Sequence, residues 1–419
     1  MTATQRTRRI LYVTQFLPRE PAICGAEVRA HNVLRELRQL GAVDLVLLCD
    51  ESTKSELASE SAQDLEFSYV FDINRHANTG IRRKIGWSLD PNLNYPHGLA
   101  VGTGSVARLG DLARYDLLWF FRSNAADMFP TMYWPRSVVD IDDVQSTYYN
   151  AVLSTELSPS KRISAMRRRF AWRRRERLLG ERFNVLAVCT HEDRAYLNAL
   201  GVRAPIHVIP NGFERPQAEP TRSSATRSTL GFIGRFDHRP NAEGIQWFVK
   251  NCWPRIKAEA PSTRLRMVGP GSNGPLAPSG QGIEGLGWLA DPSAEINSWT
   301  AMVVPIRTGA GTRVKIAQAL SAKCPIVSTV FGALGYDTGC GHGIILGDSA
   351  EAFAGACLRL IRDPGEAARL AELGWAAFLR KWTWDAIRPL VREAAQECLK
   401  LSGPDLGAQP VGQSAATRC

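Results

Sequence analysis

The sequence predicts an α/β protein with two similar lobes, each built on a Rossmann-like, doubly wound parallel sheet, that face one another across a cleft. The chain has 419 residues, which is more than one hydrophobic core usually organises. Short and nearly continuous apolar runs alternate with helical patterns, as is typical of parallel strands covered on both faces. A segment rich in proline, serine and charge at 213–228 interrupts the alternation, which indicates a linker between lobes at 1–212 and 229–401.

In the first lobe, apolar runs that end at turn residues are expected to form the strands. The segment 25–41 is expected to be a helix, because Val28, Leu37 and Leu40 recur at helical spacing and Gly41 follows as a stop signal. The expected strands are 9–17, 42–50, 115–121, 137–142, 184–190 and 205–212.

In the second lobe, the strand–helix alternation restarts. Strands are expected at 229–236, 264–271, 283–291, 298–306 and 325–329, and helices at 241–260 and 312–323. An amphipathic helix at 381–401 ends the lobe and can return to the first lobe. The composition of 402–419 predicts a disordered tail.

Composition excludes several classes of protein. The nine cysteines are scattered without a CxxC spacing, so neither a disulfide framework nor a zinc site is expected, and a reducing compartment such as the cytoplasm fits. The seven histidines form no HxH or HExxH pattern, so no metal site is expected. The first apolar run, residues 10–13, is too short for a signal peptide, and no apolar run is long enough to predict a membrane span.

Positive charge is concentrated in one segment, residues 161–182. It contains ten Lys/Arg and two Glu, in a chain whose net charge is +10. Ile163, Met166 and Phe170 form an apolar stripe within it. An anionic membrane surface, nucleic acid, or simple solvation of a helix face each explain such a segment. Because no known nucleic-acid-binding module accompanies it, nucleic acid is not expected, and we expect a peripheral position on the inner face of the cytoplasmic membrane.

The sequence GAGTRVK, at 309–315, lies between the end of an expected strand and the start of an expected helix. A helix N-terminus offers free N–H groups and a partial positive charge to an anion. Gly309 and Gly311 allow the backbone to come close to a ligand, and Arg313 and Lys315 can complete a clamp for a diphosphate. The alternative is a plain turn with two solvated cations.

Two further strand ends in the same lobe support the anion site. Gly234 and Arg235 follow one expected strand, and Gly269 and Gly271 follow another. In open α/β sheets, ligands bind at the carboxyl ends of the strands. The second lobe is therefore expected to hold a nucleotide diphosphate at its strand tips.

Three blocks of the second lobe, at 230–269, 285–296 and 304–336, resemble in order and spacing the retaining glycosyltransferases of family 4, in the bacterial branch with "PN…W" and "GTR.K" motifs. The resemblance implies the GT-B fold. It also implies a metal-independent hexosyl- or related transferase that needs no cofactor. The donor would be a nucleotide-diphosphate sugar in the C-terminal lobe, and the acceptor, a glycan or lipid-linked hydroxyl, would bind mainly in the N-terminal lobe. Bacterial surface polysaccharide or glycolipid synthesis is the expected setting.

The resemblance assigns roles by position. It places the cations Arg235, Arg313 and Lys315 at the donor diphosphate as catalytic residues, and the base pocket at Gly269 and residues 287–291. The expected donor-binding residues are Gly25, Gly234, Gly269, Gly309, Ala310, Gly311, Thr312 and Gln318.

The chain departs from the family pattern at four positions. Ala310 and Gln318 stand where many relatives carry two glutamates, and Pro240 stands where a lysine often follows the Gly-Arg pair. In the first lobe, the sequence DIDD places Asp142 where relatives often have histidine. Either Asp142 or Asp143 is expected to orient or deprotonate the acceptor hydroxyl. The alternative is a strand-end loop with capping carboxylates.

Two other functions remain open at this point. Gln318 motivates a catalytically decayed subunit that binds nucleotide-sugar without transferring it, because a neutral amide bonds a ribose hydroxyl more weakly than a carboxylate does. The segment 161–182 motivates a basic, non-enzymatic adaptor for nucleic acid or membrane.

Overall fold

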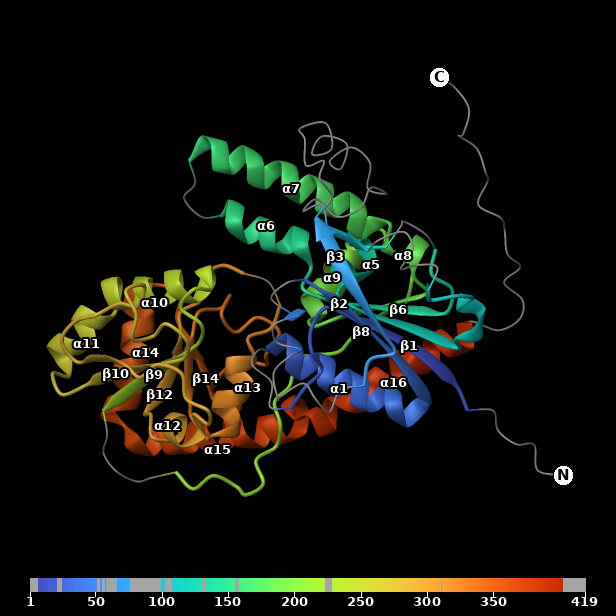
Figure 1. Cartoon of the computed structure of the whole chain (residues 1–419). Coiled ribbons are helices and arrows are strands. Elements are labelled where there is room, and N and C mark those ends of the chain that lie inside the picture. Colours follow the sequence, from blue (N-terminus) through green and yellow to red (C-terminus); the bar gives the residue numbers. More distant parts are fainter. Residues whose placement is uncertain are drawn as a thin grey trace.

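The predicted fold class is confirmed: the chain forms two α/β lobes, each around its own sheet (Figure 1). The structure is a computed structural model. It describes residues 7–20, 25–50, 53–54, 57, 66–75, 99–101, 108–129, 133–154, 158–222, 228–309 and 311–401. The expected tail at 402–419 lies outside the described residues.

The first-lobe sheet has the strand order β4-β3-β2-β1-β5-β6-β7-β8. All neighbours pair in parallel except β3 and β4, which pair antiparallel at the sheet edge. The sequence did not predict these two edge strands. The strands are β1 (Arg9–Thr14), β2 (Ala42–Cys49), β3 (Tyr69–Arg75), β4 (Leu99–Val101), β5 (Leu117–Phe121), β6 (Ser137–Asp142), β7 (Val185–Val188) and β8 (Ile206–Val208).

The second-lobe sheet is wholly parallel, with the order β11-β10-β9-β12-β13-β14. Chain order reverses direction between β9 and β12, so the carboxyl ends of those strands form the crevice in which doubly wound sheets bind ligands. The strands are β9 (Thr229–Ile233), β10 (Arg264–Val268), β11 (Ile283–Gly285), β12 (Ala301–Val304), β13 (Ile326–Ser328) and β14 (Ile344–Leu346).

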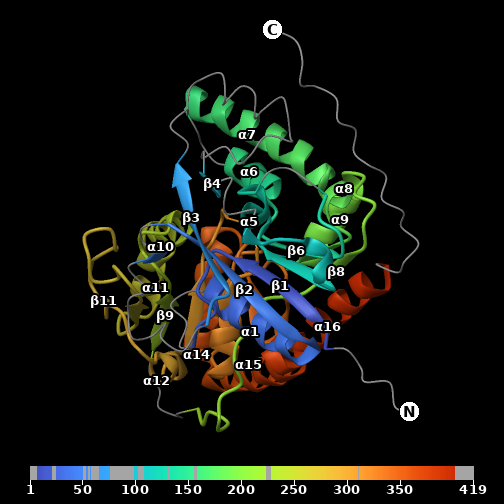
Figure 2. The same cartoon turned by 45° about the vertical axis from the view of Figure 1, so that its right-hand side comes forward.

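Helices cover both sheets (Figures 1 and 2). Those of the first lobe are α1 (Gly25–Leu40), α5 (Ser123–Asp127), α6 (Gln145–Leu153), α7 (Pro159–Arg177), α8 (Leu179–Arg182) and α9 (His191–Ala199). The later helices are α10 (Arg239–Asn251), α11 (Trp253–Glu259), α12 (Ser293–Asn297), α13 (Val314–Ser321), α14 (Ala350–Arg362), α15 (Pro364–Ala377) and α16 (Trp384–Leu401). In this described part of the chain, no helix is both long and apolar enough to cross a membrane.

The segment 241–260, expected as one helix, forms the two helices α10 and α11. They meet at Cys252, and Pro254 occupies the first turn of α11. Proline has no N–H for the helical ladder, and its ring disfavours a helix that continues through it, which explains the break.

The last helix, α16, crosses back to the first lobe and packs beside α1 (Figures 1 and 2). Its residues Trp384, Ile387 and Val391 belong to the same buried cluster as Tyr12 and other first-lobe side chains. Where α16 begins, Thr383 pairs with Phe213, at the start of the expected linker. The two segments that cross between the lobes, one near Phe213 and one near Thr383, therefore lie side by side.

Candidate active site

A cleft of about 540 Å³ lies between the lobes, at the carboxyl ends of their strands. The first lobe lines it with Gly25, Ala26, Arg122, Asp142, Asp143, Gln145, Tyr148 and Asn211, and the second with His238, Arg239, Pro240, Asn241, Ile306, Gly309, Thr312, Arg313, Val314 and Lys315. The structure therefore brings seven of the predicted site residues to one cavity: Gly25, Asp142, Asp143, Gly309, Thr312, Arg313 and Lys315.

The glycine-rich turn before α13 forms the second-lobe wall of the cleft. Gly309 and Gly311 have φ values of 130° and 66°, which favour glycine because other residues are strained there. Arg313 caps the helix in an extended conformation, and its Nη1 donates to the Gly311 carbonyl at 2.6 Å. Among the described atoms, the Thr312 Oγ1 is buried without a hydrogen-bond partner. A ligand oxygen or N–H in the cleft would satisfy this hydroxyl.

Lys315, the second residue of α13, belongs to the same wall. Its Nζ donates to the Asn241 Oδ1 at 2.8 Å and lies 4.2 Å from the centre of the Phe232 ring. A Cβ on Gly234 would come within 2.9 Å of this Nζ, so a glycine at 234 leaves room for the ammonium group. Burial, together with the neighbouring Arg313 guanidinium, lowers the pKa of Lys315 to about 7.

Two cations thus lie together, half-buried, at the N-terminus of a helix. Burial also lowers the pKa of Arg313, although the Asp143 carboxyl opposes that effect. Within the described ranges, no ion pair with a carboxylate includes Lys315. A multivalent anion such as a diphosphate would relieve the repulsion between the two groups, which is stronger here than in water because both are partly desolvated.

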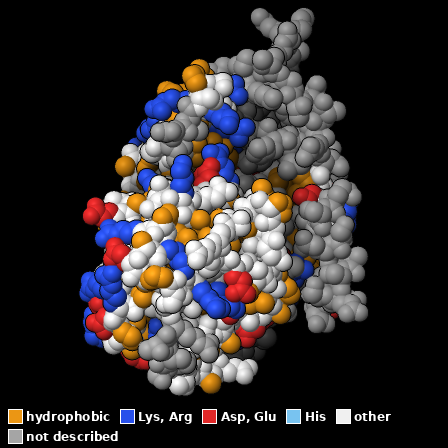
Figure 3. Space-filling model, turned by 90° about the vertical axis from the view of Figure 1, so that its left-hand side faces the viewer, with side chains coloured by type: hydrophobic (Ala, Val, Ile, Leu, Met, Phe, Trp, Pro, Cys, Tyr) orange, Lys and Arg blue, Asp and Glu red, His pale blue; other side chains and the backbone are white. Residues whose placement is uncertain are grey.

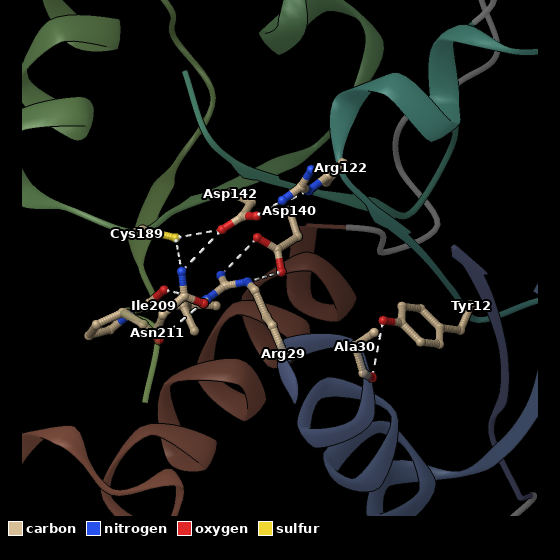
Figure 4. A network of polar contacts seen from close by, with 10 residues as sticks. Tyr12, Arg29, Ala30, Arg122, Asp140, Asp142, Cys189, Ile209 and Asn211 are labelled. Carbon is tan, nitrogen blue, oxygen red and sulfur yellow. Dashed lines mark hydrogen bonds and ion pairs between the residues drawn. The ribbon is translucent and has the colours of Figure 1, made fainter. Parts of the chain in front are cut away.

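The DIDD sequence of the first lobe, which comprises the last three residues of β6 and Asp143 after it, forms the opposite wall. Its first carboxylate, Asp140, is fully buried in a bidentate ion pair with Arg29, with N–O distances of 2.8 and 2.9 Å. Arg29 also donates to the carbonyl of Ile209. Arg29 therefore ties α1 to the end of β6 and to the residue that follows β8 (Figure 4).

Asp142 is held in place by three neighbouring residues (Figure 4). Arg122 donates to its Oδ2 at 2.7 Å, and Cys189 and Asn211 donate to its Oδ1 at 3.1 and 3.2 Å. Burial would raise the pKa of Asp142, but the Arg122 and Arg29 guanidinium groups and these hydrogen bonds outweigh it and lower the pKa to about 2. Asp142 and Arg122 both adopt positive φ, at 59° and 67°, a strain that such networks sustain at functional sites.

Asp143 has a different environment from Asp142, although the two are adjacent. Burial and the charge on Asp142 raise the pKa of Asp143 to about 6, with partial opposition from Arg122 and Arg313. Its Oδ1 faces the second lobe so closely that a Cβ on Gly311 would lie 1.9 Å away. The two adjacent carboxyls therefore differ in pKa: that of Asp142 is lowered to about 2, whereas that of Asp143 is raised to about 6.

Several predicted residues do not line the cleft. The exposed Arg235 side chain forms a bidentate pair with Asp237, at 2.6 and 3.1 Å. Gly234 and Gly269 lie against one another at the tips of β9 and β10, where a Cβ on Gly269 would be 2.3 Å from the Gly234 carbonyl oxygen. Gln318 is half-buried in the second turn of α13. Ala310 lies outside the described residues.

The sequence did not single out Arg122, Tyr148, Asn211, His238 and Asn241 as cleft residues. Arg122 is the first polar residue after the buried strand β5, and Asn211 closely follows β8. Because ligands bind at the carboxyl ends of such strands, these positions could have identified both residues as candidates. No pattern in the sequence marks Tyr148. Across the described segments, no group of three or more His, Cys, Asp or Glu is placed to hold a metal ion.

Comparison with known proteins identifies a family domain in the second lobe and the class of the fold. Residues 227–363 match the model of the family Glycosyl transferases group 1. No curated protein sequence matches the chain. Solved structures superpose on almost its whole length, at identities that establish the fold alone.

Three such structures represent the set. Alr3699/HepE from Anabaena, in complex with UDP and glucose, superposes with a TM-score of 0.60 and 16% identity, over 93% of this chain and 100% of its own. Sucrose-phosphate synthase from Thermosynechococcus elongatus gives 0.64 and 14%, over 94% and 100%. WaaG, a glycosyltransferase involved in lipopolysaccharide biosynthesis, gives 0.58 and 13%, over 93% and 99%.

The fold is therefore that of the GT-B glycosyltransferases. More narrowly, the second lobe carries a Glycosyl transferases group 1 domain, and this domain includes the cations Arg313 and Lys315.

Proposed function

We propose that the chain is a retaining, metal-independent glycosyltransferase that moves a sugar from a nucleotide-diphosphate sugar to an acceptor hydroxyl. The observation that carries this proposal is the pairing of Arg313 and Lys315 across the cleft from Asp143. The cations fit a leaving diphosphate, and the carboxylate fits the hydroxyl that replaces it. The match to the group 1 family and the UDP bound by Alr3699/HepE support a nucleotide-sugar donor.

The chemistry follows from the charges in the cleft. As the bond between the anomeric carbon and the diphosphate breaks, the sugar becomes oxocarbenium-like and negative charge grows on the leaving oxygen. Arg313 and Lys315 stabilise that charge more in the transition state than in the ground state. The acceptor oxygen forms the new bond from the face that the diphosphate leaves, which retains the configuration, and Asp143 orients the hydroxyl and takes its proton.

The acceptor class is inferred from two proteins of the same fold. WaaG acts in lipopolysaccharide biosynthesis, and TarM from S. aureus was solved with α-GlcNAc-glycerol and UDP. Both resemble this chain in fold, at 13% and 9% identity. We assign the acceptor to the glycans or glycolipids of a bacterial cell surface.

Turnover of a donor panel tests the proposal. UDP-, GDP- and ADP-sugars are each incubated with glycan and lipid-linked acceptors, and nucleoside diphosphate release is measured. The anomeric proton coupling of the product, measured by NMR, is expected to match that of the donor. If a nucleoside diphosphate binds but no donor turns over, the chain is instead the decayed subunit. In that case, a large gain of activity in Gln318→Glu would locate the defect.

The pH dependence of kcat/KM is expected to be bell-shaped, with an optimum between about pH 6 and 7. Activity rises as Asp143, whose pKa is about 6, loses its proton, and falls as Lys315, whose pKa is about 7, loses its own. A bound diphosphate favours charged Lys315, so the basic limb of kcat at saturating donor should move to higher pH. Asp143→Asn should abolish the acidic limb. An unchanged acidic limb in that variant would assign the base to another group.

A further inference from the structure

We infer that α7 is a docking surface for an anionic lipid bilayer, into whose interface it inserts an apolar stripe. This inference does not depend on the transferase activity, because it rests on the outer surface of the first lobe. It concerns the segment 161–182, whose possible partners the sequence left open.

The apolar stripe is exposed. Ile163, Met166 and Phe170 are 68%, 55% and 55% exposed, which is unusual for three large apolar side chains on one helix. At 3.6 residues per turn they share one face, opposite the face that buries Ala165 and Trp172. Among the described residues, this apolar surface therefore lies outside the buried core.

Cations flank the stripe. Lys161, Arg162, Arg167, Arg168, Arg173 and Arg177 are all exposed. On a helical projection, Arg162 and Arg173 fall on one side of the stripe and Arg167 on the other. Figure 3 shows blue and orange side chains together at the top of the molecule, where α7 lies in Figure 1. Two other arginines, Arg175 and Arg182, pair with the buried Asp127 and belong to the fold.

This combination fits a lipid surface better than a nucleic acid. Phosphate-rich nucleic acid would pair with the arginines but would leave Ile163 and Met166 in water. An anionic bilayer offers headgroup phosphates to the arginines and acyl chains to the stripe, which is how amphipathic helices bind in the plane of a membrane.

The helix is also connected to the cleft through α6. The Glu176 carboxylate on its inner face accepts hydrogen bonds from the backbone N–H and the hydroxyl of Ser146, in the first turn of α6. Arg168 donates to the hydroxyl of Tyr149 on α6. Because α6 lines the cleft through Gln145 and packs along α7, a docked α7 would hold the cleft one helix layer from the lipid surface.

Sedimentation with vesicles tests the inference. The full-length protein is mixed with vesicles of phosphatidylglycerol and phosphatidylcholine, or of phosphatidylcholine alone, at low and high salt. Two α7 variants are compared with the wild type: Ile163→Ser with Met166→Ser and Phe170→Ser, and Arg162→Glu with Arg167→Glu and Arg173→Glu. The control variant, Leu276→Ser with Lys250→Glu, changes an exposed apolar and an exposed basic residue on the second lobe.

We expect salt-sensitive binding to the anionic vesicles only, weakened about tenfold or more in each α7 variant and unchanged in the control. Unaltered melting temperatures would show that the exposed substitutions leave the fold intact. Three results would overturn the inference: no vesicle binding at low salt, full binding by the serine variant, or binding of a short nucleic-acid duplex in place of vesicles.

Discussion

Lys315→Met is expected to lower kcat/KM for the donor by about 100- to 1,000-fold, the range seen when one preorganised donor to a developing oxyanion is removed. Methionine keeps most of the side-chain volume beside Phe232 but carries no charge. Arg313→Ala should cost at least as much. Steady-state kinetics with the preferred nucleotide-sugar measures both effects, with Lys250→Met, an exposed lysine on α10, as the matched control.

The melting temperature of Lys315→Met distinguishes the loss of a charge from damage to the fold. The folded-state pKa of Lys315, about 7, lies below that of an unfolded lysine, so folding releases a proton between about pH 7 and 10. The resulting cost to stability is fully present below pH 7 and disappears as the pH rises through this range. Lys315→Met should therefore melt at a higher temperature than the wild type at pH 6. Lost activity together with a lower melting temperature would instead indicate a damaged fold.

Gly311→Ala is expected to lower kcat/KM by about 100-fold, because the new Cβ would lie 1.9 Å from the Asp143 Oδ1 and must push the two walls of the cleft apart. The proper control is Gly201→Ala. Gly201 has a comparable φ of 87°, but a Cβ there would meet nothing within 4 Å. Both variants carry the same kind of backbone strain, and only the first carries the clash.

A double-mutant cycle makes this second prediction specific to Asp143. In an Asp143→Ala background, the methyl group at position 311 has space, so Gly311→Ala should cost little further activity. If the two losses simply add, the glycine acts through something other than its contact with Asp143.

Much of the architecture was predictable because it depends on local patterns. Near-continuous apolar runs such as Leu117–Phe121 and Val185–Val188 identified parallel strands, and strand ends rich in glycine and cations located Arg313 and Lys315. Missed elements lacked such a pattern. The edge strand β4 has only three residues, and α6 has no marked apolar face.

Roles within the site were less predictable, because they depend on neighbours distant in sequence. Asp142 and Asp143 are adjacent carboxylates, yet Arg122, Cys189 and Asn211 hold the first, whereas the second faces Gly311 in the other lobe. Arg235, by contrast, pairs with a near neighbour, Asp237, on the exposed surface. Only the folded chain determines which pairs form, so residue type alone could name candidates without distinguishing them.

The central claim is that Arg313 and Lys315 form a diphosphate site in the cleft. Isothermal titration of the purified protein with UDP, GDP and ADP tests it most directly, in parallel with Lys315→Met. The account predicts saturable binding of at least one of these nucleotides, about tenfold or more weaker in the variant. Binding of equal strength in both proteins, or no binding of any of the three, would contradict it.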